Sequence, residues 1–139
     1  MTTAREIMHT GATCIQENET LEDAARRMKE LDVGALPICG PDDRLHGIIT
    51  DRDIVVKCLA AGKDPRTVKA GQLEQGKPIT TDAEADAGQV LQVMEAHKIR
   101  RLPVIDDHRL VGMISEADLA RHLPEDQVGH FVEVICAAR

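Results

Sequence analysis

Aromatic side chains are almost absent from this chain of 139 residues. Phe131 is the only aromatic residue, and the sequence contains no Trp and no Tyr. Since 42% of the residues are hydrophobic, the interior must be built from Ile, Leu, Val, Met and Ala. A binding site that stacks a flat ligand between two aromatic rings is therefore nearly excluded.

The sequence also lacks a positive balance of charge and long apolar runs. The formal net charge is -7 and the pI is 5.3, which argues against electrostatic binding to DNA, RNA or an anionic membrane surface. No apolar run approaches the roughly 18 residues of a membrane-spanning helix. The N-terminus has neither the basic nor the apolar region of a secretory signal. We expect no nucleic-acid partner, no membrane insertion and, by default, a cytoplasmic location.

Sequence signatures of metal sites and of catalysis are missing as well. The four cysteines, Cys14, Cys39, Cys58 and Cys136, form no CxxC pair, and the six histidines show no HxxxH or HExxH spacing. A metal site would need residues that only the fold brings together, so metal binding stays open. No motif combines a nucleophile, a base and an orienting partner. We therefore expect that the protein is not an enzyme.

What the chain does contain is an internal repeat of about 60 residues. A shift of 66 positions aligns LPI at 36–38 with LPV at 102–104. Past the next turn the shift becomes 65, and GIIT at 47–50 meets GMIS at 112–115. A repeat of this size predicts that each copy is one supersecondary unit that needs a neighbour to bury its apolar face.

Each copy has the order strand, helix, strand, strand, helix. The first copy predicts a strand at 13–16, a helix at 21–31 with Thr20 as N-cap, a hairpin of strands 35–39 and 45–50, and a helix at 53–61. The second predicts a strand at 79–81, a helix capped by Asp86 with Gln89, a hairpin of strands 102–105 and 110–115, and a helix at 116–123. The predicted fold class is α/β (α+β), with two tandem βαββα repeats related by pseudo-twofold symmetry.

The predicted domain organisation follows the linear sequence. Repeat 1 spans 1–62, a linker spans 63–77, the core of repeat 2 spans 78–124 with a lead-in from about residue 68, and an extension spans 125–139. Within the extension, 128–137 is apolar enough to pack as a strand or a short helix. A three-stranded sheet leaves an apolar face and two edges, so we expect the copies to pack together with a cleft on each side. Apolar surface left over favours a homodimer.

The hairpin of each copy runs into its last helix through the same short motif, Thr50-x-x-Asp53 in the first and Ser115-x-x-Asp118 in the second. A hydroxyl followed three residues later by a carboxylate is a helix-capping pattern. The carboxylate also favours the positive end of the helix dipole. Capping alone is a sufficient explanation of the motif, and it is compatible with ligand binding by the same groups.

Taken together, these patterns resemble the CBS domain pair, or Bateman module. The resemblance rests on both Leu-Pro strands and on both strand-to-helix motifs, and it covers residues 5–123. The length, with no attached enzyme or channel domain, is similar to the stand-alone CBS-pair proteins of bacterial stress responses of the hypoxia or dormancy type. The resemblance implies a non-enzymatic regulatory or binding protein that forms a homodimer. The alternative is a structural or protein-interaction module, with an unknown protein partner and empty clefts.

The resemblance also implies a ligand class and its contacts. Members of the family commonly bind adenosine-containing molecules such as AMP, ADP, ATP and S-adenosylmethionine. Carried onto this sequence, the ribose would contact Thr50, Asp53, Ser115 and Asp118, the adenine Thr13, Leu36, Ile79 and Leu102, and the phosphates Arg100, Arg101, Arg121 and His122. The first copy has Gly34-Ala35 where the second has Arg100-Arg101, so the second offers more positive charge to a nucleotide.

Two of the cysteines can form a disulfide in this arrangement. The first and second strands of a βαββα unit are expected to be parallel neighbours, with Cys14 on one and Cys39 at the end of the other. A bond requires that their Cα atoms approach within about 7 Å. The alternative is two buried thiols in a reducing cytoplasm, whereas an oxidised pair would suggest export without a signal peptide.

Overall fold

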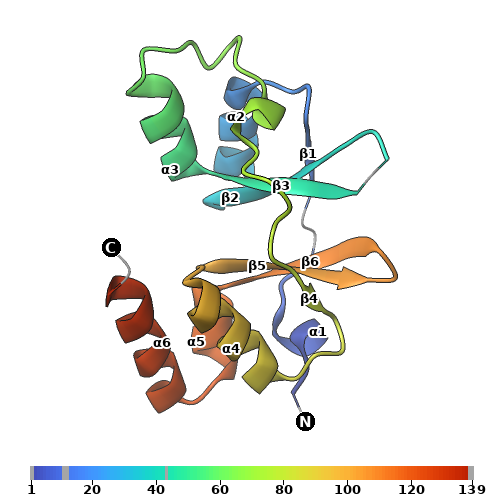
Figure 1. Ribbon diagram of the computed structural model, residues 1–139, viewed down its shortest axis with the longest axis vertical. Coiled ribbons are helices and arrows are strands. Elements are labelled where there is room, and N and C mark those ends of the chain that lie inside the picture. The colour runs from blue at the N-terminus through green and yellow to red at the C-terminus, as the bar shows by residue number, and fades with distance from the viewer. Residues whose placement is uncertain (1, 11–12, 43, 138–139) are drawn as a thin grey trace. The chain divides into compact units, whose positions relative to one another are not determined.

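The computed structural model describes residues 2–10, 13–42 and 44–137, and it contains two compact units, each built on one three-stranded sheet (Figure 1). The first-repeat unit is Thr13–Pro78, and the second-repeat unit combines Met1–Ala12 with Ile79–Arg139. Each sheet has a parallel pair followed by an antiparallel hairpin. The predicted fold class, a mixed fold of two βαββα repeats, is confirmed.

In the first-repeat unit the sheet order is β1 (Ile15–Gln16), β2 (Ala35–Cys39), β3 (Leu45–Thr50). The helical elements α2 (Leu21–Leu31), α3 (Asp51–Asp53) and η1 (Ile54–Leu59) lie on one face of this sheet (Figure 1). That face presents Ile15, Leu36, Ile38 and Ile49, alternate residues of their strands, and all four are buried in the core of the unit. Thr20 caps α2 as predicted, since its hydroxyl accepts a bond from the Asp23 N–H.

In the second-repeat unit the sheet order is β4 (Thr81–Asp82), β5 (Arg101–Asp106), β6 (Arg109–Ser115). Its helices are α1 (Ala4–Ile7), α4 (Ala87–His97), α5 (Glu116–His122) and α6 (Glu125–Ala137). The predicted capping pair of α4, Asp86 with Gln89, is present. The extension, for which the sequence left a strand or a helix open, forms α6 and buries Phe131 in the core.

The compact units cut the chain differently from the linear repeat ranges. Residues 2–10 belong to the second-repeat unit, where Ala4 and Ile7 are fully buried. The backbone N–H of Arg5 donates to the carbonyl of Ala83 at 2.9 Å. Residues 63–77 complete the first-repeat unit, because Ala70 of η2 (Ala70–Leu73) is buried in its core. Residues 2–10 thus pack on the second repeat, which is distant in sequence. Residues 63–77 pack on the first repeat, which precedes them.

Two predicted elements differ from the structure. The strand predicted at 79–81 begins only at Thr81, where parallel pairing with Val104 starts, and Ile79 before it is 38% exposed. The helix predicted at 53–61 begins as α3 and continues as the π-helix η1, in which the N–H of Ala60 donates to the carbonyl five residues earlier. On η1 the side chains of Val55, Val56 and Leu59 are about half exposed.

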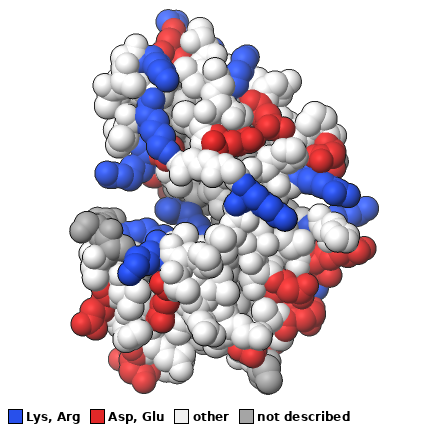
Figure 2. All heavy atoms as spheres, in the orientation of Figure 1, with Lys and Arg blue, Asp and Glu red and all other residues white. Residues whose placement is uncertain are grey.

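Charge is mixed rather than segregated on the visible surface. Figure 2 shows Lys and Arg side chains interspersed with Asp and Glu side chains on one face.

Among the described residues, no helix combines the length and the apolar character that crossing a bilayer requires.

Candidate metal site

The two strand-to-helix motifs cap their helices as predicted. The N–H of Asp53 donates to the Thr50 hydroxyl at 3.0 Å, and the N–H of Thr50 donates back to the Asp53 carboxylate at 3.0 Å. Ser115 and Asp118 make the same reciprocal pair at 3.4 and 2.8 Å. Four backbone and side-chain groups at each helix start are thereby satisfied.

The two motif carboxylates nevertheless sit in different surroundings. The Asp118 side chain is 4% exposed, and its Oδ2 also accepts from the Ser115 hydroxyl and lies 2.7 Å from Nδ1 of His9. The Asp53 side chain is 16% exposed and lies 3.3 Å from the ammonium group of Lys57. Asp118 is therefore saturated by its own protein, whereas Asp53 keeps more contact with solvent.

The residues assigned to adenine fall into two environments. Leu36 and Leu102 are buried within the apolar cores of their units. Thr13 and Ile79 lie just before β1 and β4 and are exposed. Each unit thus holds one core residue and one surface residue of the set.

The residues assigned to phosphate belong to the second-repeat unit, and most have partners there. Arg100 pairs with Glu116 at 3.1 Å, and Nη1 of Arg121 lies 3.7 Å from Asp118. Nδ1 of His122 lies 2.9 Å from the Asp118 carbonyl, while Arg101 begins β5 half-buried. Glu116 neutralises the charge of Arg100, which weakens the attraction of Arg100 for the phosphates of a nucleotide.

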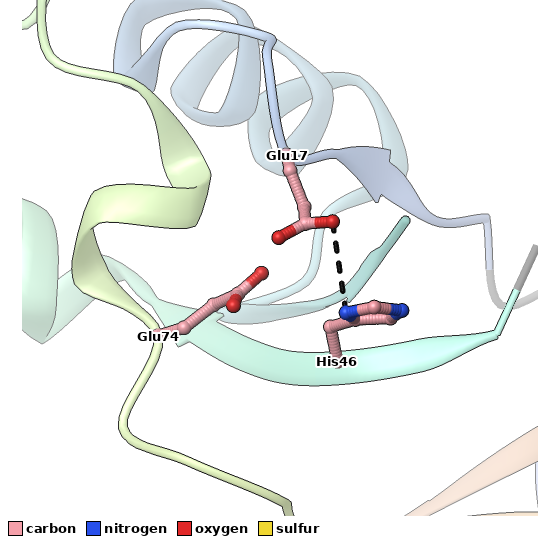
Figure 3. Close-up of side chains that lie close together, drawn as sticks. All are labelled: Glu17, His46 and Glu74. Atoms are coloured by element: carbon pink, nitrogen blue, oxygen red, sulfur yellow. Dashed lines mark ion pairs between the residues drawn. The ribbon is translucent and has the colours of Figure 1, made fainter. Parts of the chain in front are cut away.

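A third group of polar side chains, in the first-repeat unit, converges more closely. Glu17 follows β1, His46 lies on β3 and Glu74 follows η2. One ligand atom from each lies within 4.8 Å of the other two (Figure 3). The carboxylates of Glu17 and Glu74 point toward one another, and the His46 ring lies beside Glu17 with Nδ1 3.6 Å from Oε1 (Figure 3). We call these three residues the Glu–His–Glu cluster.

A β-bulge turns His46 toward this cluster. Ile38 pairs with Gly47, but Cys39 pairs with Leu45, so His46 is an extra residue on β3. Strict alternation from the core residue Ile49 would place His46 on the opposite face of the sheet. The bulge redirects its side chain to the face that carries Glu17, as bulges beside functional sites often do.

The two carboxylates of the cluster repel one another. Burial raises the pKa of Glu74, and the neighbouring Glu17 carboxyl raises it further. Oε1 of Glu74 is buried and has no hydrogen-bond partner among the described residues. Two carboxylates cannot donate to each other, so the facing oxygens are satisfied only if a proton or a cation lies between them.

His46 is oriented by a second carboxylate outside the cluster. Its Nε2 lies 3.1 Å from Oδ1 of Asp42. The pKa of Asp42 is lowered, mainly because the backbone N–H of Arg44 donates to it and also through His46. In the tautomer whose Nε2–H donates to Asp42, the lone pair of Nδ1 lies on the side of Glu17. A carboxylate behind the imidazole in this way is typical of histidines that bind metals.

The second repeat provides an internal comparison. The hydrogen bond from Glu17 N to Cys39 O at 3.2 Å is matched by one from Ala83 N to Ile105 O at 3.0 Å. The same bulge recurs in the second hairpin, with Val111 as the extra residue. The positions that match the cluster are Ala83, Val111 and Met8, all apolar and all packed in the second core. The fold therefore does not require polar groups at these places.

Cys14 and Cys39 form a disulfide in the same unit. Their Cα atoms are 5.6 Å apart, and the bond links the residue before β1 to the end of β2. Of the remaining cysteines, Cys58 is buried and Cys136 is exposed, and both are free thiols.

Comparison with known proteins places the chain in a family. The model of the CBS domain matches residues 4–59 and 70–125, the two repeats. The chain belongs to the CBS domain family. This CBS-pair chain is 58% identical over 137 residues to "Hypoxic response protein 1" of Mycobacterium tuberculosis (strain ATCC 25618 / H37Rv), covering 99% of this chain and 96% of that protein. The predicted resemblance is thus confirmed.

Solved CBS structures share the fold. The crystal structure of Hypoxic Response Protein I with two coordinated zinc ions matches with a TM-score of 0.80 and 60% identity, over 88% of this chain and 100% of that one. A hexameric CBS-CP12 protein from bloom-forming cyanobacteria matches with a TM-score of 0.79 and 30% identity, over 88% of this chain and 71% of that one. The first of these proteins binds zinc, and the second is an oligomer.

Sequence reasoning missed the Glu–His–Glu cluster of this CBS-pair chain. Its three residues are far apart in the sequence and form no metal motif. A usable signal was present in the repeat itself, because the alignment sets Glu17 against Ala83 and Glu74 against Met8. Polar residues in one copy that oppose apolar residues in the other mark positions where the copies have different roles.

Proposed function

We propose that this chain is a non-enzymatic regulatory CBS-pair protein of a hypoxia-type stress response, and that its ligand is a divalent transition metal, zinc in the first instance. The metal would bind at the Glu–His–Glu cluster. The observation that carries the proposal is the convergence of Glu17, His46 and Glu74 within 4.8 Å, with a buried, unpaired Glu74 oxygen.

The ligand chemistry favours zinc or a similar ion. Imidazole nitrogen and carboxylate oxygen are common zinc ligands, and three protein ligands leave a fourth position for water or for a group from a partner. A dication would cancel the repulsion between Glu17 and Glu74 and would occupy the lone pair that Asp42 leaves on His46. The 60% identical Hypoxic Response Protein I, which carries coordinated zinc, adds support from outside the chain.

Zinc titration of the chelator-treated protein tests the proposal. Isothermal calorimetry of the wild type should give a micromolar or tighter site that His46→Gln loses. His130→Gln is the matched control, because His130 also lies 3.1 Å from a glutamate, Glu95, but has no third ligand beside it among the described residues. Wild-type zinc affinity in His46→Gln would contradict the assignment of the cluster.

Adenosine-ligand binding is a second candidate, and we place it at the first repeat. Asp53 has Thr50 beside it and the cation of Lys57 3.3 Å away, and its side chain, 16% exposed, is the motif carboxylate that retains more access to solvent. Titration with AMP, ATP and S-adenosylmethionine at protein concentrations near 100 μM, on the order needed for weak ligands, should give heat that Asp53→Asn abolishes. No heat from any of the three ligands would reject this candidate.

We also propose that the protein is a homodimer. The side chains of Val55, Val56 and Leu59 expose apolar surface on η1, which a second copy of the same face would bury. Light scattering should show a dimer for the wild type and a monomer for Val56→Glu. A monomeric wild type at micromolar concentration would refute the proposal.

A cytoplasmic location is part of the proposal, with export as the alternative if the Cys14–Cys39 pair is oxidised in cells. Alkylation of thiols in intact cells followed by mass measurement distinguishes the two. Four labelled cysteines support a reducing location, and two support an oxidising one.

A further inference from the structure

The disulfide and the Glu–His–Glu cluster share the same short stretch of backbone. Cys14 precedes β1 and Glu17 follows it, with only Ile15 and Gln16 between them. The strand β1 is held to β2 by two register pairs, the second of which joins Gln16 to Cys39. The backbone N–H of Glu17 then donates to the carbonyl of Cys39 itself at 3.2 Å. The position of Glu17 is thus set by a two-residue strand that the disulfide fastens to its neighbour.

The other half of the disulfide borders the cluster directly. Gly40 follows Cys39, and a Cβ atom built on Gly40 would lie 2.7 Å from both Oε1 of Glu17 and Nε2 of His46. The backbone at Cys39 and Gly40 therefore forms a wall of the cluster. Movement of β1 against β2 would change both the Glu17 to His46 distance and this wall.

The sulfur atoms themselves face away from the cluster. Side chains alternate along a strand, so Cys14 lies on the opposite face from Glu17, and Cys39 on the opposite face from Gly40. The cysteines are absent from the group of candidate ligand atoms in the described chain. Free thiols at these positions would therefore not replace a lost ligand.

The second repeat again serves as the comparison. Its parallel pair, Thr81 with Val104 and Asp82 with Ile105, forms without a disulfide, since Thr80 and Ile105 stand where the first repeat has Cys14 and Cys39. The strand pairing of this fold does not need the bond. The disulfide and the cluster occur together in one repeat, and they share β1, since Cys14 precedes this strand and Glu17 follows it.

We propose that the Cys14–Cys39 disulfide gates the metal site, so that its reduction weakens metal binding by the Glu–His–Glu cluster. This inference rests on the proposed function. A dithiol reductant supplies two electrons and two protons: the S–S bond breaks, two protein thiols form, and the reductant closes to its own disulfide. The strand β1 then keeps its two register pairs and the bond from the Glu17 N–H to the Cys39 carbonyl, but it loses its covalent link to β2, which loosens the position of Glu17 opposite His46 and Glu74.

The test measures zinc affinity in both redox states of the full chain. Wild-type protein is compared as the disulfide and after reduction by a dithiol, which is removed under anaerobic conditions before titration with zinc. Reduction should weaken binding by about 10- to 100-fold, the range seen when groups that orient a metal ligand are lost. The double variant Cys14→Ser with Cys39→Ser should bind as weakly as the reduced protein in either condition. Cys136→Ser, which removes an exposed free thiol, should respond to reduction as the wild type does.

The outcomes separate the two proposals. Equal affinities in the two redox states, or tighter binding after reduction, would overturn the gate and leave the metal site standing. Absence of zinc binding in both states would overturn the proposed function and the gate with it. Far-UV circular dichroism of reduced wild-type protein shows whether the fold persists, so that a loss of affinity with the fold intact supports the gate.

Discussion

Replacement of Glu74 by glutamine should stabilise the metal-free protein at neutral pH. The Glu74 carboxylate faces Glu17, and their nearest ligand atoms lie within 4.8 Å. Two unit charges at that distance repel by about 1 kcal/mol in a water-like medium and about 3.5 kcal/mol at an effective dielectric constant of about 20. Since the pair is half-buried, we expect Glu74→Gln to raise the free energy of unfolding by about 1 to 2 kcal/mol, or roughly 4 °C in melting temperature per kcal/mol.

The pH dependence of this gain follows from the raised pKa of Glu74. The pKa of Glu74 in the folded protein lies above its ordinary value of 4.5. The contribution of Glu74 to the free energy of unfolding is therefore most favourable at low pH, where its carboxyl is protonated in both the folded and the unfolded protein. The wild type loses that stability as pH rises through the raised pKa. The advantage of Glu74→Gln should therefore be near zero below pH 4.5 and develop fully above the raised pKa.

Denaturant unfolding in the presence of a chelator, at about pH 4 and at about pH 7, measures the stabilisation by Glu74→Gln and its dependence on pH. Zinc should reverse the ranking, since it stabilises only the protein that binds it. Glu133→Gln, on the exposed side of α6, is the control and should change stability by less than about 0.5 kcal/mol. If Glu74→Gln lowers the chelated protein's stability at pH 7, the repulsion inferred here is absent.

Two further predictions concern the helix starts. Thr50→Ala removes the cap of α3 and should cost about 1 kcal/mol in urea unfolding, while leaving zinc affinity unchanged. A large loss of zinc affinity in Thr50→Ala would show that capping is not its main role. His9→Ala removes a partner 2.7 Å from the buried Asp118 carboxylate and should destabilise the protein by about 1 to 3 kcal/mol. An unchanged unfolding midpoint for His9→Ala would mean that this contact is not formed in solution.

The fold was largely predictable because local and long-range patterns agree. The helix α2 shows its apolar face and its Thr20 cap directly in the sequence, and the repeat identifies the same elements a second time. Prediction failed where tertiary pairing decides the outcome. The strand β4 starts at Thr81 because its partner Val104 lies there, and η1 adopts a π-helix that propensity alone does not distinguish from an α-helix.

The site was predictable only in part. The motif residues Thr50 and Asp53 can be recognised in the sequence because they act on their own helix start. The Glu–His–Glu cluster instead depends on three segments that only the fold brings together. His46 is the clearest case, since strict alternation along β3 assigns it to the wrong face and only the bulge corrects this. An extra residue between two strands is visible in a sequence, but its exact position within the hairpin is not.

The packing of α1 on the second-repeat unit has a consequence for the order of folding. The ribosome makes Ala4 and Ile7 before the first-repeat unit, whereas their core partners Leu102, Ile114 and Phe131 are made after it. The first-repeat unit, Thr13–Pro78, is continuous and can close while synthesis proceeds. The second-repeat unit cannot complete its core until the segment that follows the first-repeat unit has been made. A fragment that starts at residue 79 therefore lacks part of its own core, so the two repeats are unequal as pieces despite their shared pattern.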